Sequence, residues 1–263
     1  MVGDVYATLI AAAALWGAAA GLLVPRAAYR LAVAPEEAWR ARCPAGHPIT
    51  GPAAGWLGTP RCAPCDSGAH NGGEPDGAPY APSRLLPAVT ALACAALAAA
   101  TGPRPELAVW LLLVPFAVLL ARVDLAVRRL PDVLTLPLAA ATAALLGFVA
   151  LLPGDGGPGG GSWPTSLLGG LALGACYFVL FLVNPKGLGF GDVKLALVLG
   201  VALGWYGWGV LFAGAFAGFL LGSVYGSALM LRHRTTRGLT LPFGPFMIAG
   251  AFLGLLAAGL ATG

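Results

Sequence analysis

The sequence predicts an all-α, polytopic membrane protein with about eight transmembrane helices. Of its 263 residues, 58% are hydrophobic and only 10% are charged, and the mean hydropathy is +0.82. A soluble globular domain carries about 25% charged residues. Apolar runs of about twenty residues, the length that crosses about 30 Å of hydrocarbon, recur along the chain. These observations exclude a soluble domain, and they also exclude a disordered chain, which would be polar.

The apolar runs divide the chain into spans and one long polar segment. In order, the predicted spans are Val5–Val24, Leu85–Ala100, Leu107–Leu120, Val133–Leu152, Leu167–Val183, roughly Leu188–Leu203, Val210–Leu231 and Pro242–Ala261. The segment at 25–84 is rich in Pro and Gly and poor in aliphatic residues. It could not form a stable core without an additional cross-link such as a disulfide or a bound metal. We therefore expect a first transmembrane helix at 1–24, a polar segment at 25–84 and a membrane domain of seven helices at 85–263.

The distribution of Lys and Arg predicts the orientation of these spans. When residues 25–84 are placed in the cytoplasm, 14 of the 15 basic residues fall on the cytoplasmic side, and Arg104 alone falls on the other. Cytoplasmic connections carry such an excess of basic residues in membrane proteins. We therefore expect both termini outside and a multi-pass location in the cytoplasmic membrane. The formal charge of +4 follows from the same bias, so we expect membrane lipids and no nucleic acid among the partners.

The polar segment contains a group of metal-ligand residues. Cys43 and His47 form one short pair, and Cys62 and Cys65 form another. A reducing cytoplasm favours metal binding over a disulfide, and tetrahedral zinc takes four ligands of these types. The spacing predicts a structural zinc site, with His70 as an alternative fourth ligand. A loop with free thiols is the competing interpretation.

Three carboxylates lie at the cytoplasmic edges of apolar spans, where charged groups are costly and are functional candidates. Asp132 follows Pro131 in the first turn of a helix, and a role in complementing the helix dipole is favoured there. Asp192 follows Gly-Phe-Gly, about one turn inside the membrane, and helix capping explains it only in part. Asp124 ends the third span, near a helix C-terminus where a carboxylate is unfavourable, so capping does not explain it.

Asp124 and Asp192 at one membrane depth suggest acid–base chemistry on water. Two carboxylates that approach closely cannot both ionise cheaply, so they share a proton. One then acts as general base on a water molecule, while the protonated partner polarises a scissile carbonyl. Gly189 and Gly191 would let a substrate backbone approach the pair, because glycine has no side chain and adopts unusual turns.

Three stretches of the sequence resemble one known family, the type IV prepilin peptidases, bacterial members of the Gly-x-Gly-Asp intramembrane aspartic proteases. The residues that resemble it are Asp124–Pro137 (DLAVRRLPDVLTLP), Lys186–Leu195 (KGLGFGDVKL) and Leu241–Phe246 (LPFGPF). The resemblance implies that Asp124 and Asp192 are the catalytic pair. It also implies cleavage of the short basic leader of prepilins or pseudopilins at the cytoplasmic face of the bacterial inner membrane.

Full-length members of that family carry two Cys-x-x-Cys pairs, associated with zinc and with methylation of the new N-terminus by S-adenosylmethionine. This sequence departs from the pattern, because Gly46 stands where the second Cys of the first pair belongs. The resemblance therefore supports peptidase activity and leaves methyltransferase activity open. Two alternatives belong to other functional classes. One is a small transporter or channel with functional acids, and the other is a structural membrane scaffold, which would not explain a carboxylate at position 124.

Overall fold

The computed structural model describes residues 2–34, 36–66, 81, 83–152, 161–185, 187–233 and 242–262. In these residues the chain forms helices and no strand. The helices are α1 (Val2–Gly21), α2 (Val24–Leu31), α3 (Pro52–Gly55), α4 (Ala63–Asp66), α5 (Leu85–Thr101), α6 (Glu106–Val127), α7 (Asp132–Leu151), α8 (Trp163–Val183), α9 (Phe190–Gly204), α10 (Trp208–His233) and α11 (Gly244–Thr262).

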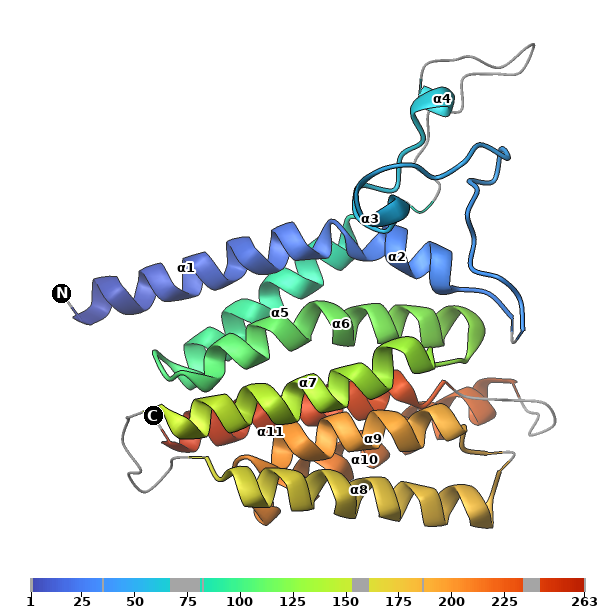
Figure 1. Cartoon of the computed structure of the whole chain (residues 1–263). Coiled ribbons are helices and arrows are strands. Elements are labelled where there is room, and N and C mark those ends of the chain that lie inside the picture. Colours follow the sequence, from blue (N-terminus) through green and yellow to red (C-terminus); the bar gives the residue numbers. More distant parts are fainter. Residues whose placement is uncertain are drawn as a thin grey trace.

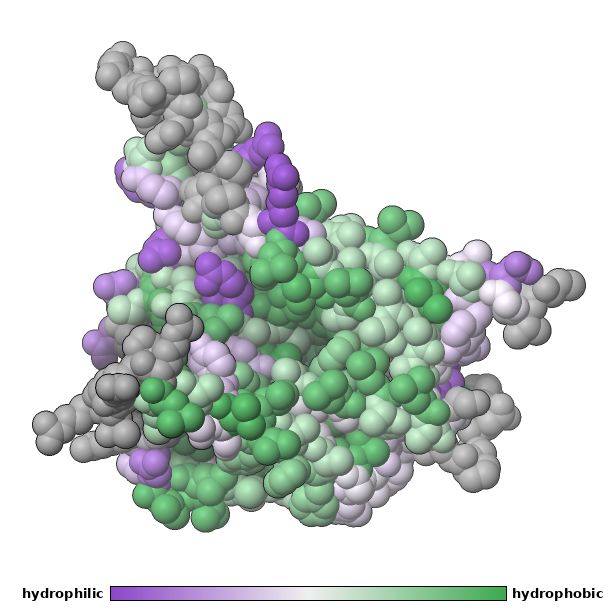
Figure 2. All heavy atoms as spheres, turned by 180° about the vertical axis from the view of Figure 1, so that it is seen from behind, coloured by the Kyte–Doolittle hydropathy of each residue, from purple (hydrophilic) through white to green (hydrophobic). Residues whose placement is uncertain are grey.

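A helix lies at each of the eight predicted spans. Within the described residues, six helical stretches are long and apolar enough to cross a membrane, whereas α5 and α9 are shorter. The third span is longer than the sequence predicted, because α6 continues past Leu120 to Val127. Asp124 therefore lies inside the last turn of α6 rather than at the end of a shorter helix. The hydrophobic surface of this bundle is seen from behind in Figure 2.

The helices run side by side as a bundle (Figure 1). The main pairs are α1 with α5, α8 with α9, and α10 with α11. Small residues let two of these pairs approach until their backbones touch, as is common in membranes. A Cβ added to Gly200 of α9 would lie 2.5 Å from the carbonyl oxygen of Gly169 in α8, and one added to Gly250 of α11 would collide with the backbone of Gly218 in α10.

Helix α2 was not expected, and it attaches the polar segment to the bundle. Its apolar face packs on α6, where Val24, Ala28 and Leu31 contact Leu119 and Val123. Two buried arginines lie on the same helix. Their side chains donate to backbone carbonyls of the polar segment, Arg26 to Gly55 at 2.9 Å and Arg30 to Ala54 at 2.9 Å. These contacts hold the polar segment that follows α2 against the start of the bundle.

One end of the bundle gathers the segments that carry the candidate acids. The turn between α6 and α7, the start of α9 and the start of α11 all lie at the end near α2 (Figure 1). Both ends of the described chain lie at the opposite end of the bundle. The fold thus brings three stretches that are far apart in sequence to one edge of the predicted membrane domain.

Candidate active site

Asp124 is buried at the C-terminal end of α6, where its carboxylate contacts another helix. Its Oδ2 accepts the backbone N–H of Gly244, the first residue of α11, at 3.0 Å. The first N–H groups of a helix lack partners within the helix, and a carboxylate there also complements the helix dipole. The expectation that capping does not explain Asp124 is therefore wrong, because its carboxylate caps α11 rather than its own helix.

Asp192 is buried in the first turn of α9, at the third helical position. Its Oδ2 accepts the backbone N–H of Gly189 at 3.0 Å, and its own N–H donates to the carbonyl of Gly189 at 3.0 Å. Gly189 is thus the N-cap residue, and Asp192 completes the cap from inside the helix. Capping accounts for one carboxylate oxygen of Asp192, as the sequence suggested.

Leu130, in the turn between α6 and α7, packs between the two acidic segments. A Cβ added to Gly191 would lie 3.0 Å from the Cβ of Leu130, and one added to Gly244 would lie 3.6 Å from its Cδ1. Leu130 is itself buried. The carboxylates of Asp124 and Asp192 are near enough to interact electrostatically. The structure thus brings together the two acids that the sequence paired.

A residue that the sequence does not mark as functional, Tyr177, lies near Asp192 in the structure. This residue of α8 is buried and lies near enough to Asp192 to interact with its charge. Its ring packs on Phe219 of α10, with centroids 5.4 Å apart, and on Phe243, which precedes Gly244, with centroids 6.3 Å apart. One feature of the sequence could have indicated it, because Tyr177 is the single tyrosine of a long apolar span. Burying its hydroxyl group is costly unless a polar group lies nearby.

The pair leaves one oxygen of each acid available for chemistry. Among the described residues, both carboxylates accept a backbone N–H through Oδ2, and neither Oδ1 has a hydrogen-bond partner. The two N–H groups orient the carboxylates, and the surrounding helices keep them out of bulk water. Such an arrangement can hold a water molecule between two acids that share a proton. It has the groups required for general acid–base hydrolysis of a carbonyl compound.

Asp132 has a different environment from the two buried acids. It is the first residue of α7, as expected, and its side chain is 65% exposed. Its Oδ2 forms an ion pair with the Nζ of Lys194 at 2.6 Å, and the Lys194 ammonium also lies 4.7 Å from the centre of the Phe190 ring. This cross-helix ion pair between α7 and α9 supports a structural role for Asp132.

The four predicted metal ligands also come together. The ligand atoms of Cys43, His47, Cys62 and Cys65 all lie within 4.8 Å of one another. The Cys43 and Cys65 sulfurs are 3.9 Å apart, and the Nδ1 of His47 is 3.7 Å from the first sulfur and 3.4 Å from the second. Zinc–sulfur bonds of about 2.3 Å at tetrahedral angles place two sulfurs about 3.8 Å apart, so the residues fit a tetrahedral metal. His70 lies outside the described residues.

The turn from Cys43 to His47 gives Gly46, which stands where the family has a second Cys, a conformational role. The N–H of Cys43 donates to the carbonyl of His47 at 2.9 Å, and the N–H of Gly46 donates to the carbonyl of Cys43 at 2.9 Å. Gly46 has a φ of +85°, which glycine adopts without strain. Burial raises the pKa of the Cys43 thiol, but hydrogen bonds from the backbone of His47 and Ala45 and from the neighbouring thiols lower it overall. The turn therefore favours the thiolate that a metal requires.

Comparison with known proteins points to one family. The profile of the type IV leader peptidase family matches residues 111–231. A protein of Aeromonas hydrophila named prepilin leader peptidase/N-methyltransferase is 34% identical over 227 residues, covering 82% of this chain and 71% of the relative. Proteins of the same name from Aeromonas salmonicida (strain A449) and Bacillus subtilis are 31% and 37% identical, over 82% and 36% of this chain and 71% and 37% of the relative. No solved structure matches the chain.

Proposed function

Because the chain belongs to the type IV leader peptidase family, we propose that Asp124 and Asp192 are the catalytic pair with which it cleaves the leaders of type IV prepilins and pseudopilins. The observation that carries this assignment is the burial of both carboxylates at one end of the bundle, each oriented by a backbone N–H. A transporter or channel is not favoured, because it would place its acids near the membrane midplane and in paired, broken helices.

The proposed mechanism uses one ionised and one protonated carboxylate. The ionised acid takes a proton from the bound water as the water oxygen attacks the scissile carbonyl carbon. The protonated acid donates a hydrogen bond to the carbonyl oxygen and stabilises the charge that develops there. When the tetrahedral intermediate breaks, a proton from the pair passes to the leaving amine. The Oδ1 atoms of Asp124 and Asp192, which have no hydrogen-bond partner in the described part of the chain, suit these transfers, since the Oδ2 atoms accept the N–H groups of Gly244 and Gly189.

The protein is a multi-pass membrane protein, and we place it in the bacterial inner membrane with the catalytic pair at the cytoplasmic face. This orientation rests on the positive-inside distribution of Lys and Arg. The pair lies at the bundle end near α2, whose Arg26 and Arg30 belong to the side with the basic excess. We expect membrane lipids around the bundle and no nucleic-acid partner.

The function is tested by expressing the full chain together with a prepilin in a strain that lacks its own prepilin peptidase. The mass of the mature prepilin N-terminus reports cleavage and methylation at the same time. We expect removal of the leader. A further mass increase of one methyl group would show that methyltransferase activity is retained and that S-adenosylmethionine is a second cofactor. Unprocessed prepilin, at matched levels of both proteins, would contradict the proposed function.

We propose that Cys43, His47, Cys62 and Cys65 hold one structural zinc ion. Purified protein should contain about one zinc per chain, and the metal should be lost when Cys62 and Cys65 are both replaced by Ser, because a structural site needs its full ligand set. The matched control is Cys176→Ser, which removes an exposed cysteine of α8 outside the cluster. Elemental analysis measures the metal. A stably folded preparation without metal would contradict this prediction.

We also propose that Gly189 and Gly191 let the substrate backbone approach the pair. We expect Gly191→Val to slow cleavage by roughly tenfold, about 1.4 kcal/mol of barrier, without unfolding the enzyme. A Cβ added to Gly191 would lie 3.0 Å from the Cβ of Leu130, so Leu130, which packs between the two acidic segments, would have to shift. The control is Gly209→Val in α10, where an added Cβ has no neighbour within 4 Å.

Close approach of the substrate backbone to the acids also makes a prediction about the substrate residue before the scissile bond. A glycine there lowers the cost of a non-helical turn, so its replacement by Ala should slow cleavage modestly, and replacement by Val should slow it severely. Cleavage rates are measured with equally inserted prepilins. If Val in the substrate and Val at Gly191 were both tolerated at the unmodified rate, close backbone approach would be wrong.

A further inference from the structure

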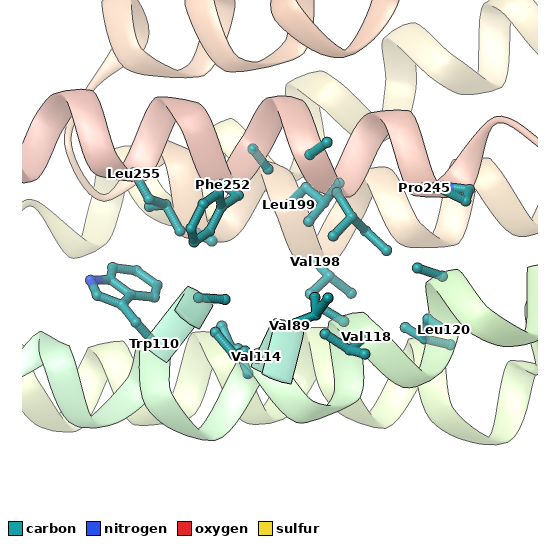
Figure 3. Close-up of a pocket in the computed structure, with 18 of the residues that line it drawn as sticks. Val89, Trp110, Val114, Val118, Leu120, Val198, Leu199, Pro245, Phe252 and Leu255 are labelled. Carbon is teal, nitrogen blue, oxygen red and sulfur yellow. The ribbon is translucent and has the colours of Figure 1, made fainter. Parts of the chain in front are cut away.

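A cavity of about 690 Å³ lies between α5 and α6 on one side and α9 and α11 on the other (Figure 3). Its wall on α6 is one face of that helix, with Trp110, Val114, Ala117 and Ala121 spaced by three or four residues. The wall on α11 has the same spacing, with Pro245, Ile248, Phe252 and Leu255. Apart from Arg122, the described lining residues are uncharged and almost all are aliphatic or aromatic.

One end of the cavity reaches the catalytic pair. Pro245 lines that end (Figure 3) and directly follows Gly244, whose N–H is bonded to Asp124. Arg122 and Leu125, which flank Asp124 on α6, line the same end. The cavity therefore ends next to the residues that flank the proposed site, and its single charged lining residue, Arg122, lies at that end.

The other end is closed by Trp110, which is held by buried polar contacts. Its Nε1 donates to the hydroxyl of Tyr206 at 3.1 Å, and that hydroxyl donates to the Oε1 of Glu106 at 3.3 Å. Glu106 is buried and lies 3.6 Å from the Nε of Arg104. Trp110 and Leu125 are fifteen positions apart on α6, so this wall is about 22 Å long at 1.5 Å per residue.

The cavity opens through the side of the bundle rather than through an end. Its rim residues Leu92 on α5 and Leu125 on α6 are 71% and 57% exposed. In a membrane this opening faces hydrocarbon. A polypeptide can enter it laterally only if its backbone hydrogen bonds are already made, because the lining offers almost no polar partners. An α-helix meets that condition, whereas an extended strand does not.

We propose that this cavity receives one face of an apolar helix of the substrate, formed by the part of its chain that follows the scissile bond. The inference rests on the proposed function, since a chain cleaved beside Asp124 must continue away from it. Along the cavity, apolar side chains stay in hydrocarbon while one helix face packs into a groove, a common mode of helix recognition. Trp110 limits the docked length to about fifteen residues, counted at 1.5 Å per residue from the pair.

The first test fills the cavity from two opposite walls. Ala117→Phe on α6 and Ala249→Phe on α11 both place a ring in it, and both positions are half-buried. The matched control is Ala144→Phe, an exposed position of α7 that does not line the cavity. Each variant is assayed in membranes with a full-length prepilin and with a short soluble peptide that has the same cleavage junction but no apolar helix.

We expect both filled variants to lower the ratio of full-length to short-peptide cleavage at least tenfold, and the control to keep the ratio of the unmodified enzyme. An unchanged ratio in the filled variants would overturn the proposal and indicate that only lipid acyl chains occupy the cavity. An equal loss of cleavage rate with both substrates would overturn the proposal as well, since the added ring would then disturb Asp124 and Asp192 rather than the binding of a substrate helix. If the unmodified enzyme cleaves neither substrate, the proposed function itself fails.

A second test does not depend on activity. In the Asp192→Asn background, Cys94 and Cys176 of the membrane helices are replaced by Ala and the cysteines of the metal cluster are kept. In this protein Ala117→Cys should form a disulfide with a substrate cysteine about seven residues beyond the scissile bond. Ala117 precedes Asp124 by seven residues, or about 10 Å of helix. A cysteine at Ala144 serves as the control and should form no crosslink. Absence of any crosslink from Ala117 at substrate positions five to nine would overturn the proposal.

Discussion

Replacing either Asp124 or Asp192 by Asn should reduce prepilin cleavage by at least about 100-fold, the smaller contribution expected of a general acid or base. An amide can neither take a proton from water nor supply one to the leaving group. It can still accept a hydrogen bond through its carbonyl oxygen, so the contacts to Gly244 and Gly189 are kept and the protein should insert and accumulate normally. The measurement is the fraction of processed prepilin at matched enzyme levels.

Asp132→Asn is the matched control for these substitutions. It changes a third carboxylate of the same region, but that side chain is 65% exposed and is paired with Lys194. An amide can still accept a hydrogen bond from Lys194, and Asp132 does not belong to the buried pair, so this variant should keep substantial activity. Full activity in the Asp124→Asn variant would remove Asp124 from the catalytic pair, whatever the behaviour of Asp132.

The positions of the spans could be predicted because a membrane helix is specified locally. Twenty apolar residues are sufficient to indicate it, and each predicted span overlaps a helix of the structure. The Cys43–His47 and Cys62–Cys65 pairs were also visible, because metal-ligand residues recur at short spacings. The two buried acids stood out for a similar reason, since few explanations exist for a carboxylate at membrane depth.

The contacts that connect distant segments could not be read from local patterns. The bond between Asp124 and Gly244 joins residues 120 positions apart, so the spacing around Asp124 contains no sign of it. From sequence, Arg26 and Arg30 indicate only the orientation of the first span, because basic residues after a membrane helix favour the cytoplasmic side. In the structure they also hold the polar segment through its backbone carbonyls.

Glu106, at the other end of the bundle, is a second residue whose contacts cannot be predicted from the local sequence. It lies in a short connection, where an acid needs no explanation from sequence, yet the structure buries it beside Arg104 and Tyr206. Tyr206, in the turn between α9 and α10, uses its hydroxyl to link Trp110 to Glu106. Their connection to the cavity runs through Trp110, which no local sequence pattern indicates.

The bond from Gly244 to Asp124 gives the Pro-Phe-Gly-Pro stretch at 242–245 a physical role. Its glycine supplies the N–H that orients the acid, and the following Pro245 lies in the first turn of α11, where its missing N–H costs nothing. The preceding Phe243 packs on Tyr177 and Phe219, which fixes where α11 begins. The stretch thus positions a carboxylate of the pair from the opposite side of the bundle.

Gly244→Ala should therefore reduce cleavage by about 100-fold, the cost of displacing a reacting group by about 1 Å. An added Cβ would lie 2.8 Å from the Oδ2 and 3.3 Å from the Cγ of Asp124, which is too close, so the carboxylate must move. The backbone itself accepts alanine, because the φ of Gly244 is not among the positive values of the described residues. Alanine also has a higher helix propensity than glycine. Activity and stability should thus separate, with cleavage lost and the thermal midpoint of the purified protein nearly unchanged.

Gly209→Ala makes the same change in the first turn of α10, where an added Cβ has no neighbour within 4 Å, and it should keep the activity of the unmodified enzyme. Both variants are compared by cleavage rate at equal amounts of membrane-inserted protein. If Gly244→Ala cleaves at the unmodified rate, the glycine contact does not determine the position of the Asp124 carboxylate. If it loses activity together with its thermal stability, the effect lies in the packing of α11 and not in the orientation of the acid. If Gly244→Ala loses cleavage but stays stable while Gly209→Ala remains active, the result supports a carboxylate of Asp124 that is held in place by the first N–H of α11.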